Sequence, residues 1–303
     1  MAAVTIRGEL GEIGRIAYGC WRFAGTDVAA ARTKVETALE VGITLIDTAD
    51  IYGYDGSAPA PGGGFGDAEE LLGRVLADTP GLRDRMVLAT KGGITPPVPY
   101  DSSSSYLGDA CEASLRRLRT DVVDLYQIHR PDLLAHPADV AGTLDGLVTS
   151  GKVRAIGVSN FTVAQTRALQ EHLDTPLATM QPEFSPLALD PITDGSFDLA
   201  METGLAPLAW SPLAGGRLAG DIDPLDERAA AVAQVCDRLA DEHDVDRTAI
   251  LLAWAMRHPA GVVPIIGTQQ PERIRDTARA IDVDMTPGQW YEILVAGRGE
   301  PMP

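Results

Sequence analysis

Four polar residues in the first half of the chain could together carry out proton transfer. Asp47 and Tyr52 stand five residues apart, and Lys91 and His129 follow them. A phenol ionises near pH 10, so a tyrosine that donates a proton near neutrality needs its pKa lowered by roughly two to three units. One ammonium about 4 Å away, at an effective dielectric near 20, supplies about that much. These residue types therefore predict that Tyr52 is a proton donor with three assisting residues.

The assisting roles follow from the chemistry of the side chains. Asp47 would hold Lys91 charged and in place, because a carboxylate beside an ammonium favours its charged form. Lys91 would then lower the pKa of Tyr52. His129 would bond the substrate oxygen and orient it, as an oxyanion-hole donor does.

Each of these residues comes at or just beyond the end of a short apolar run that is typical of a buried parallel strand. Taken singly, Asp47 would more often cap a turn, Lys91 would more often be solvated, and His129 would more often be a hydrogen-bonded core residue. The carboxyl ends of parallel strands meet on one side of a sheet, however. We therefore expect the four side chains to meet there.

Eight strand-like runs alternate with helix-like segments along the 303 residues. The predicted strands are 15–19, 43–47, 86–91, 122–129, 153–159, 178–183, 205–210 and 262–267. The predicted helices are 28–41, 68–77, 105–118, 140–149, 163–172, 226–241 and 271–280. This order and length predict an α/β protein with a single (β/α)8 TIM barrel domain over residues 1–303. We also expect a short N-terminal hairpin on the barrel floor and an extra helix, 247–257, late in the chain.

Composition limits the partners and the compartment. The formal charge of −18 and pI of about 4.6 argue against nucleic acid and anionic membrane as partners. The three cysteines lack metal-ligand spacing, which argues against a zinc site and predicts reduced thiols in a cytoplasmic protein. Only three of the 25 basic residues are lysines, namely Lys34, Lys91 and Lys152. Each lysine is therefore a candidate for a specific role.

The sequence resembles the aldo-keto reductase family along almost its whole length. The matching stretches are DTADIY at 47–52, ATK at 89–91, QIHRPD at 127–132, GKVRAIGVSNF at 151–161 and WSPL at 210–213. Within the family it is most similar to the bacterial YdhF-type oxidoreductase branch, through segments 18–22, 129–132 and 209–213. The resemblance implies hydride transfer from a nicotinamide cofactor to an aldehyde or ketone, without metal or flavin. The family's catalytic tetrad falls on Asp47, Tyr52, Lys91 and His129, with Tyr52 as general acid.

The resemblance also implies a set of cofactor contacts. Ser159, Asn160 and Gln181 match the family's carboxamide-binding residues, and the ring of Trp210 would stack on the nicotinamide. The family's pyrophosphate loop corresponds to Ser211, Leu213 and Gly215.

The segment that grips the adenosine 2′-phosphate corresponds to Gly267, Thr268 and Arg273. Gly267 stands where many members have lysine, but Arg273 alone can make a bidentate bond to a phosphate. NADPH is therefore the expected cofactor and NADH the alternative. Arg273 could instead be a surface arginine that pairs with Glu272 or Asp276.

The substrate is expected to contact residues at the barrel mouth. Trp21, Tyr54 and His129 are the candidates, and a glycine- and proline-rich loop after Tyr52 would shape the entrance. Glu70 is a further candidate near the cofactor. The expected partner is a small-molecule carbonyl compound, and the chain would act as a monomer or a small homo-oligomer.

Two other functions fit the same residues. The first is a nicotinamide-binding regulatory module with little turnover, because family members of that kind keep the tetrad. The second is a Schiff-base aldolase on a generic barrel, with Lys91 as its nucleophile.

Overall fold

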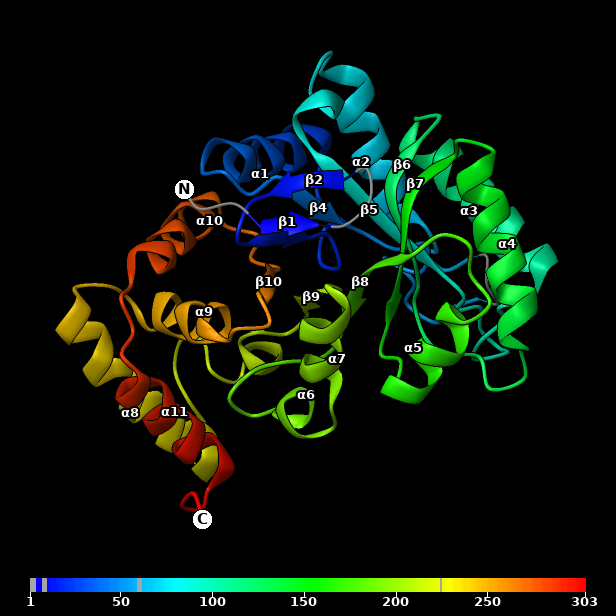
Figure 1. Ribbon diagram of the computed structural model, residues 1–303. Helices are drawn as coiled ribbons and strands as arrows, with labels where there is room; N and C mark the ends of the chain where they lie inside the picture. Colours follow the sequence, from blue (N-terminus) through cyan, green and yellow to red (C-terminus); the bar gives the residue numbers. More distant parts are fainter. Residues whose placement is uncertain (1–3, 7–9, 59–61, 224) are drawn as a thin grey trace.

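A closed barrel of eight parallel strands lies at the centre of the computed structural model, which describes residues 4–6, 10–58, 62–223 and 225–303. The strands are β3 (Ala17–Gly19), β4 (Leu45–Asp47), β5 (Val87–Gly92), β6 (Val123–Ile128), β7 (Val153–Ser159), β8 (Leu177–Gln181), β9 (Ala206–Ala209) and β10 (Val263–Ile266). β10 pairs with β3 and closes the barrel (Figure 1). Each predicted run contains or overlaps one of these strands, so the predicted (β/α)8 barrel is confirmed.

Helices surround the barrel (Figure 1). Those that correspond to predicted segments are α1 (Val28–Glu40), α2 (Asp67–Asp78), α3 (Ser104–Leu118), α4 (Pro137–Thr149), α5 (Val163–Gln170), α8 (Glu227–His243), α9 (Arg247–Arg257) and α10 (Pro271–Thr277). The extra late helix is α9. Three helices were not predicted, namely α6 (Asp190–Thr193), α7 (Ser196–Thr203) and α11 (Pro287–Arg298). Within the described ranges, short 3-10 turns also lie at Arg83–Arg85, Ala214–Gly216 and Ala278–Asp282.

The predicted N-terminal hairpin is present and closes the floor of the barrel. β1 (Val4–Ile6) pairs with β2 (Gly11–Ile13) in antiparallel register. Ile6 and Ile13 are buried in the same apolar cluster as the residues inside the lower barrel. A ligand-binding site would therefore have to lie at the other end of the barrel, where the strands have their carboxyl ends.

Inside the barrel, an apolar layer lies below a polar one. Along β4, β5 and β6 the alternation of strand side chains pairs Leu45 with Asp47, Ala89 with Lys91, and Leu125 with Gln127. In each pair the apolar residue belongs to the interior cluster, and the polar residue lies nearer the carboxyl end. Regular strand geometry therefore carries Asp47, Lys91 and Gln127 to the same level.

Gly157 on β7 keeps this polar layer close-packed. A Cβ atom there would lie 2.1 Å from Thr179 Oγ1 and 3.2 Å from Gln127 Cγ. We expect Gly157→Ala to lower the free energy of unfolding by about 1–3 kcal/mol, because the interior cannot move apart cheaply. Gly142→Ala, in α4 with nothing within 4 Å of the added carbon, is the control and should stabilise slightly. Urea unfolding checks both, and equal effects would contradict this account.

No helix in the described ranges is long and apolar enough to cross a membrane. Cys20, Cys111 and Cys236 are all buried and none forms a disulfide.

Candidate active site

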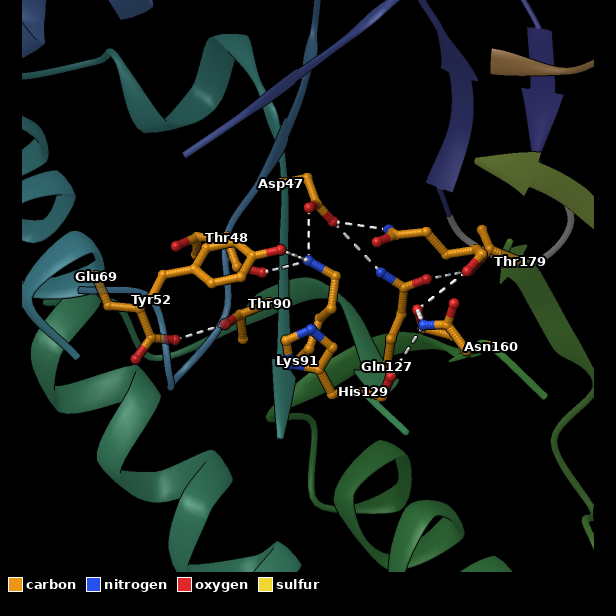
Figure 2. A network of polar contacts seen from close by, with 12 residues as sticks. Asp47, Thr48, Tyr52, Glu69, Thr90, Lys91, Gln127, His129, Asn160 and Thr179 are labelled. Carbon is orange, nitrogen blue, oxygen red and sulfur yellow. Dashed lines mark hydrogen bonds and ion pairs between the residues drawn. The ribbon is translucent and has the colours of Figure 1, made fainter. Parts of the chain in front are cut away.

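The ammonium of Lys91 organises the polar layer at the mouth of the barrel. Its Nζ donates to Asp47 Oδ2 at 2.5 Å, to the carbonyl oxygen of Thr48 at 2.8 Å and to Tyr52 Oη at 3.1 Å (Figure 2). Lys91 is fully buried and Asp47 is almost so. All three N–H bonds of the ammonium therefore have acceptors, and one of them points at the phenol.

Asp47 is held from the opposite side of the barrel as well. Its Oδ1 accepts from Gln181 Nε2 at 3.0 Å and from Gln127 Nε2 at 3.5 Å. Gln127 Oε1 in turn accepts from Thr179 Oγ1 at 3.1 Å. Figure 2 shows this chain of contacts running from Lys91 through Asp47 towards β8. The carboxylate is therefore fixed from two directions.

A second chain of hydrogen bonds connects residues at the ends of β7, β8 and β9. Ser159 Oγ donates to the carbonyl oxygen of Gln181 at 3.0 Å, and Asn160 Nδ2 donates to Ser159 Oγ at 2.7 Å. Trp210 Nε1 donates to Asn160 Oδ1 at 2.9 Å. Asn160 has a left-handed backbone with φ of 58°, a conformation that is uncommon outside glycine and is often found at functional sites. This chain fixes the plane of the indole.

His129 lies beside Tyr52. The ring centroids are 5.8 Å apart and the planes meet at 77°, so one ring presents its edge to the other. Burial, followed by the charges of Lys91 and Arg130, holds the pKa of His129 well below its ordinary value. The imidazole is therefore neutral at neutral pH and keeps one N–H that it can donate.

The pKa of Tyr52 corrects one expectation from the sequence. Burial raises it, and the opposing ammonium of Lys91 does not bring it below its ordinary value. Burial also disfavours the charge on Lys91, but Asp47 and Tyr52 together outweigh it and raise the pKa of this lysine. The pair therefore rests as a neutral phenol beside a stable ammonium.

The depressed pKa of His129 has a consequence for stability. Below the unfolded value of 6.5 the unfolded chain binds a proton at this histidine that the folded protein does not. Stability should therefore fall as pH decreases below 6.5, by at most about 1.4 kcal/mol per pH unit from this group. Urea unfolding of the parent and of His129→Asn between pH 5 and 8 should show the steeper acid loss in the parent. The same pH dependence of the free energy of unfolding in both proteins would contradict the assignment of this acid loss to His129.

A groove of about 1040 Å³ runs from the barrel mouth to the loop after β10. Apart from Glu70, every residue expected near cofactor or substrate lines this groove, and so do Asp47 and Tyr52. Lys91 is absent from the walls because it is fully buried behind them. These contact residues are Trp21, Tyr54, His129, Ser159, Asn160, Gln181, Trp210, Ser211, Leu213, Gly215, Gly267, Thr268 and Arg273. The structure therefore brings the predicted residues together. Residues 59–61 of the glycine- and proline-rich loop lie outside the described residues.

The groove is lined by several arginines that differ in whether they form ion pairs. Among the residues described, Arg22, Arg130 and Arg273 line it without an ion pair. Arg273 pairs with neither Glu272 nor Asp276, which disfavours its reading as a paired surface residue. Arg247 differs, since Asp237 accepts from it through two contacts of 2.6 Å. In a chain of net charge −18, unpaired arginines suit a polar or anionic ligand.

The structure also shows two side chains that sequence reasoning missed. Glu69, not Glu70, is buried: it accepts from Thr90 Oγ1 at 2.5 Å and from Arg117 Nε at 2.7 Å, whereas Glu70 is exposed. Its position three and seven residues before the buried Leu72 and Leu76 could have indicated this.

The second missed residue is Gln127. It stands two residues before His129 on β6, opposite Lys91 on β5, and bonds Asp47. The alternation of strand side chains could have indicated that Gln127 points into the barrel, because Leu125, two residues earlier on β6, also points inwards.

Comparisons with known proteins agree with the fold and identify the family. The sequence profile of the Aldo/keto reductase family matches residues 15–294. The chain is 56% identical to a 6-dehydroglucose reductase from Novosphingobium aromaticivorans, over 95% of this chain and 93% of that protein. It is 35% identical to the oxidoreductase YdhF from Escherichia coli, over 99% of both chains.

One solved structure is also similar to this chain along almost its whole length. The aldo/keto reductase from Klebsiella pneumoniae, in complex with NADP and acetate, superimposes with a TM-score of 0.77 at 28% identity, over 99% of this chain and 96% of that one. The fold, the profile match and the identity to curated reductases agree with the resemblance of the motifs. The chain therefore belongs to the aldo/keto reductase family, whose members in this comparison are oxidoreductases.

Proposed function

We propose that the protein reduces an aldehyde to the primary alcohol, with NADPH as hydride donor and Tyr52 as general acid. The observation that carries this proposal is the phenol of Tyr52, which lines the groove while a buried ammonium donates to its oxygen at 3.1 Å. That arrangement keeps the proton on the phenol at rest and stabilises the phenolate when the proton leaves.

The residues divide the proton chemistry among them. NADPH, when bound, supplies the hydride that reaches the carbonyl carbon. Tyr52 gives its proton to the carbonyl oxygen, and Lys91 compensates the negative charge that develops on Tyr52. Asp47 keeps Lys91 charged and aimed at the phenol. His129, as a neutral imidazole, donates to the carbonyl oxygen and orients it.

The groove suits a nicotinamide dinucleotide. Trp210 presents an indole whose N–H is already fixed by Asn160, so little entropy is lost when a ring stacks on it. Gly215 and Gly216 have φ values of 69° and 106°, and a Cβ atom on either would meet nothing within 4 Å. The amide of Gly216 already donates to the carbonyl oxygen of Leu213 at 3.0 Å, so the amide of Gly215 is the proposed donor to a phosphate oxygen in this loop. Arg273 at the far end would bind the 2′-phosphate that distinguishes NADPH from NADH.

The substrate is proposed to be a polyhydroxylated aldehyde such as 6-dehydroglucose. The relative at 56% identity carries that compound in its name. Among the described residues, Arg22 and Arg130 at the mouth form no ion pair, so their guanidinium groups would donate to sugar hydroxyls. The rings of Trp21 and Tyr54 would pack on a pyranose face.

The proposal is tested by following NADPH absorbance at 340 nm with the purified protein. We expect oxidation that requires both NADPH and carbonyl, a lower KM for 6-dehydroglucose than for hexanal, and slower turnover with NADH. Absence of turnover on every aldehyde, together with tight NADPH binding, would contradict the proposal and favour the regulatory module.

The aldolase function finds less support in the site. A Schiff base requires a neutral, nucleophilic amine, whereas Lys91 pairs with Asp47 and its pKa is raised. Borohydride trapping with a carbonyl compound should therefore leave Lys91 unmodified.

A further inference from the structure

Lys34 is the one lysine whose role is not yet explained. Lys91 belongs to the active site, and Lys152 lies half exposed on the surface in an ion pair with Glu112. Lys34 lies on the buried face of α1, with only 7% of its surface exposed, and within the described ranges no carboxylate lies within ion-pair distance. Burying an unpaired ammonium is costly, so a compensating interaction is expected.

The contacts of Lys34 lead to the far end of the groove. Its Nζ donates to Gln269 Oε1 at 3.0 Å and lies 5.8 Å from the centroid of the Phe23 ring. The described part of the chain provides no further hydrogen-bond acceptor for its Nζ, although an ammonium has three N–H donors. Lys34 is not among the residues that line the groove, so its remaining hydrogen-bonding capacity is left for water, and its charge can act on a ligand only through the loop.

Gln269 transmits this contact to the loop after β10. Its Nε2 donates to the carbonyl oxygen of Gly267 at 3.2 Å and to Tyr18 Oη at 3.3 Å. Tyr18 Oη donates to the carbonyl oxygen of Thr268 at 3.3 Å. Figure 1 shows α1 beside α10, the helix that this loop enters. Lys34 thus braces loop 267–270 from behind, and that loop lines the groove.

Arg273 approaches the same loop from the groove side. It is exposed, lines the groove and has no ion pair with a described carboxylate. Arg247 also lines the groove, but Asp237 neutralises it. Lys34 and Arg273 lie on either side of one loop, and neither has an ion-pair partner in the described part of the chain; in a protein of net charge −18 they create a local positive potential. Such a potential favours an anionic ligand group, and it favours a phosphate dianion more than a monoanion because the interaction grows with charge.

We propose that Lys34 is a positioning residue for the cofactor's 2′-phosphate: its ammonium holds Gln269 and places positive charge behind loop 267–270. The inference rests on the proposed function, because it requires a nicotinamide dinucleotide in the groove. Lys34 then favours NADP+ over NAD+ through its charge, in addition to bracing the loop.

The test separates charge from bracing. Isothermal titration calorimetry gives Kd for NADP+ and for NAD+ with the parent protein, Lys34→Gln, Lys34→Arg and Lys152→Gln. Glutamine can still donate to Gln269 but carries no charge. We expect Lys34→Gln to weaken NADP+ binding about tenfold and NAD+ binding less than twofold, the size of effect that one nearby charge exerts on a dianion. Lys34→Arg should keep the parent ratio, and Lys152→Gln should match the parent for both cofactors.

Other outcomes would overturn the inference. If Lys34→Gln weakened the binding of NADP+ and of NAD+ equally, Lys34 would be a structural brace only. If both affinities were unchanged, Lys34 would have no role in cofactor binding. A parent protein that binds neither dinucleotide would overturn the proposed function as well, so the two failures are distinguishable.

A second measurement does not depend on the folding of a Lys34 variant. Arg273→Ala changes an exposed residue and leaves Lys34 in place. We expect this variant to retain a preference for NADP+ over NAD+ that declines as NaCl rises from 0.05 to 0.5 M, about the range over which salt screens such charges. Complete loss of the preference at every salt concentration would contradict the role of Lys34.

Discussion

Tyr52→Phe should reduce kcat for carbonyl reduction by about 10²- to 10⁴-fold, the usual contribution of a positioned general acid. The ring stays, so the edge-on packing against His129 and the cation–π contact with Lys91, at 4.8 Å from the ring centroid, are retained. Only the proton and the oxygen are lost. Kd for NADP+ should therefore remain within about twofold of the parent value, since none of the proposed cofactor contacts changes.

Tyr54→Phe is the matched control for this experiment. Tyr54 lines the same groove, but its hydroxyl donates to the carbonyl oxygen of Ala58 at 2.9 Å and to no residue of the Lys91 network. Steady-state kinetics at 340 nm should show near-parent kcat for Tyr54→Phe. If Tyr52→Phe retained turnover within about threefold of the parent, Tyr52 would not be the proton donor.

Lys91→Met should cost both activity and stability. The substitution leaves Asp47 as a buried charge without its ammonium, a loss that typically destabilises a protein by about 3–5 kcal/mol. For a chain of this size the melting temperature should fall by roughly 6–20 °C. kcat should fall by at least about 10²-fold, because the phenolate of Tyr52 would form without a compensating charge.

The double variant Asp47→Asn, Lys91→Met distinguishes the two effects. It removes the buried carboxylate charge while an amide can still accept from Gln181, so calorimetric melting should recover much of the lost stability. Activity should stay as low as in Lys91→Met. A double variant that melts lower than the single one would show that the Asp47 charge is not the cause of the instability.

The strands and the four residues of the proposed tetrad were predictable because local patterns determine them. An apolar run that ends in a polar residue marks the carboxyl end of a parallel strand, and β7 has the predicted bounds of 153–159. The late helix α9 likewise has its predicted bounds of 247–257. The predicted starts of α3 and α8, at 105 and 226, lie within one residue of the observed starts, where Ser103 and Asp226 accept from backbone N–H groups as N-caps.

Missed helices differ in how much local signal they carry. α11 begins with Thr286 as N-cap, Pro287 next and Gln289 at the third position, a capping box that could have been recognised. α6 has only four residues, and α7 starts after Gly195 without a side-chain cap. α6 is too short to show a helical period, and for both segments tertiary packing decides whether they are helical.

The direction of the Tyr52 pKa could not be predicted from the sequence. Residue types give the sign and approximate size of the effect of Lys91 on the pKa of Tyr52, but the opposing effect of burial depends on how completely the phenol is removed from water. That burial arises from strands and helices far apart in the chain. The same limit applies to Glu69 and Glu70, where one residue decides which carboxylate is inside.

The hydrogen bond from Gln181 to Asp47 joins residues that are 134 positions apart in the sequence. Contacts of such long range form late in folding, because the entropy of closing a long loop must be overcome first. A folding intermediate with β3 to β6 in place would hold Lys91 beside Asp47 but leave the carboxylate unbraced from β8. Recovery of activity on refolding should therefore lag behind the recovery of helical circular dichroism. An early half-barrel would contain Asp47 and Lys91 in contact but would not be active.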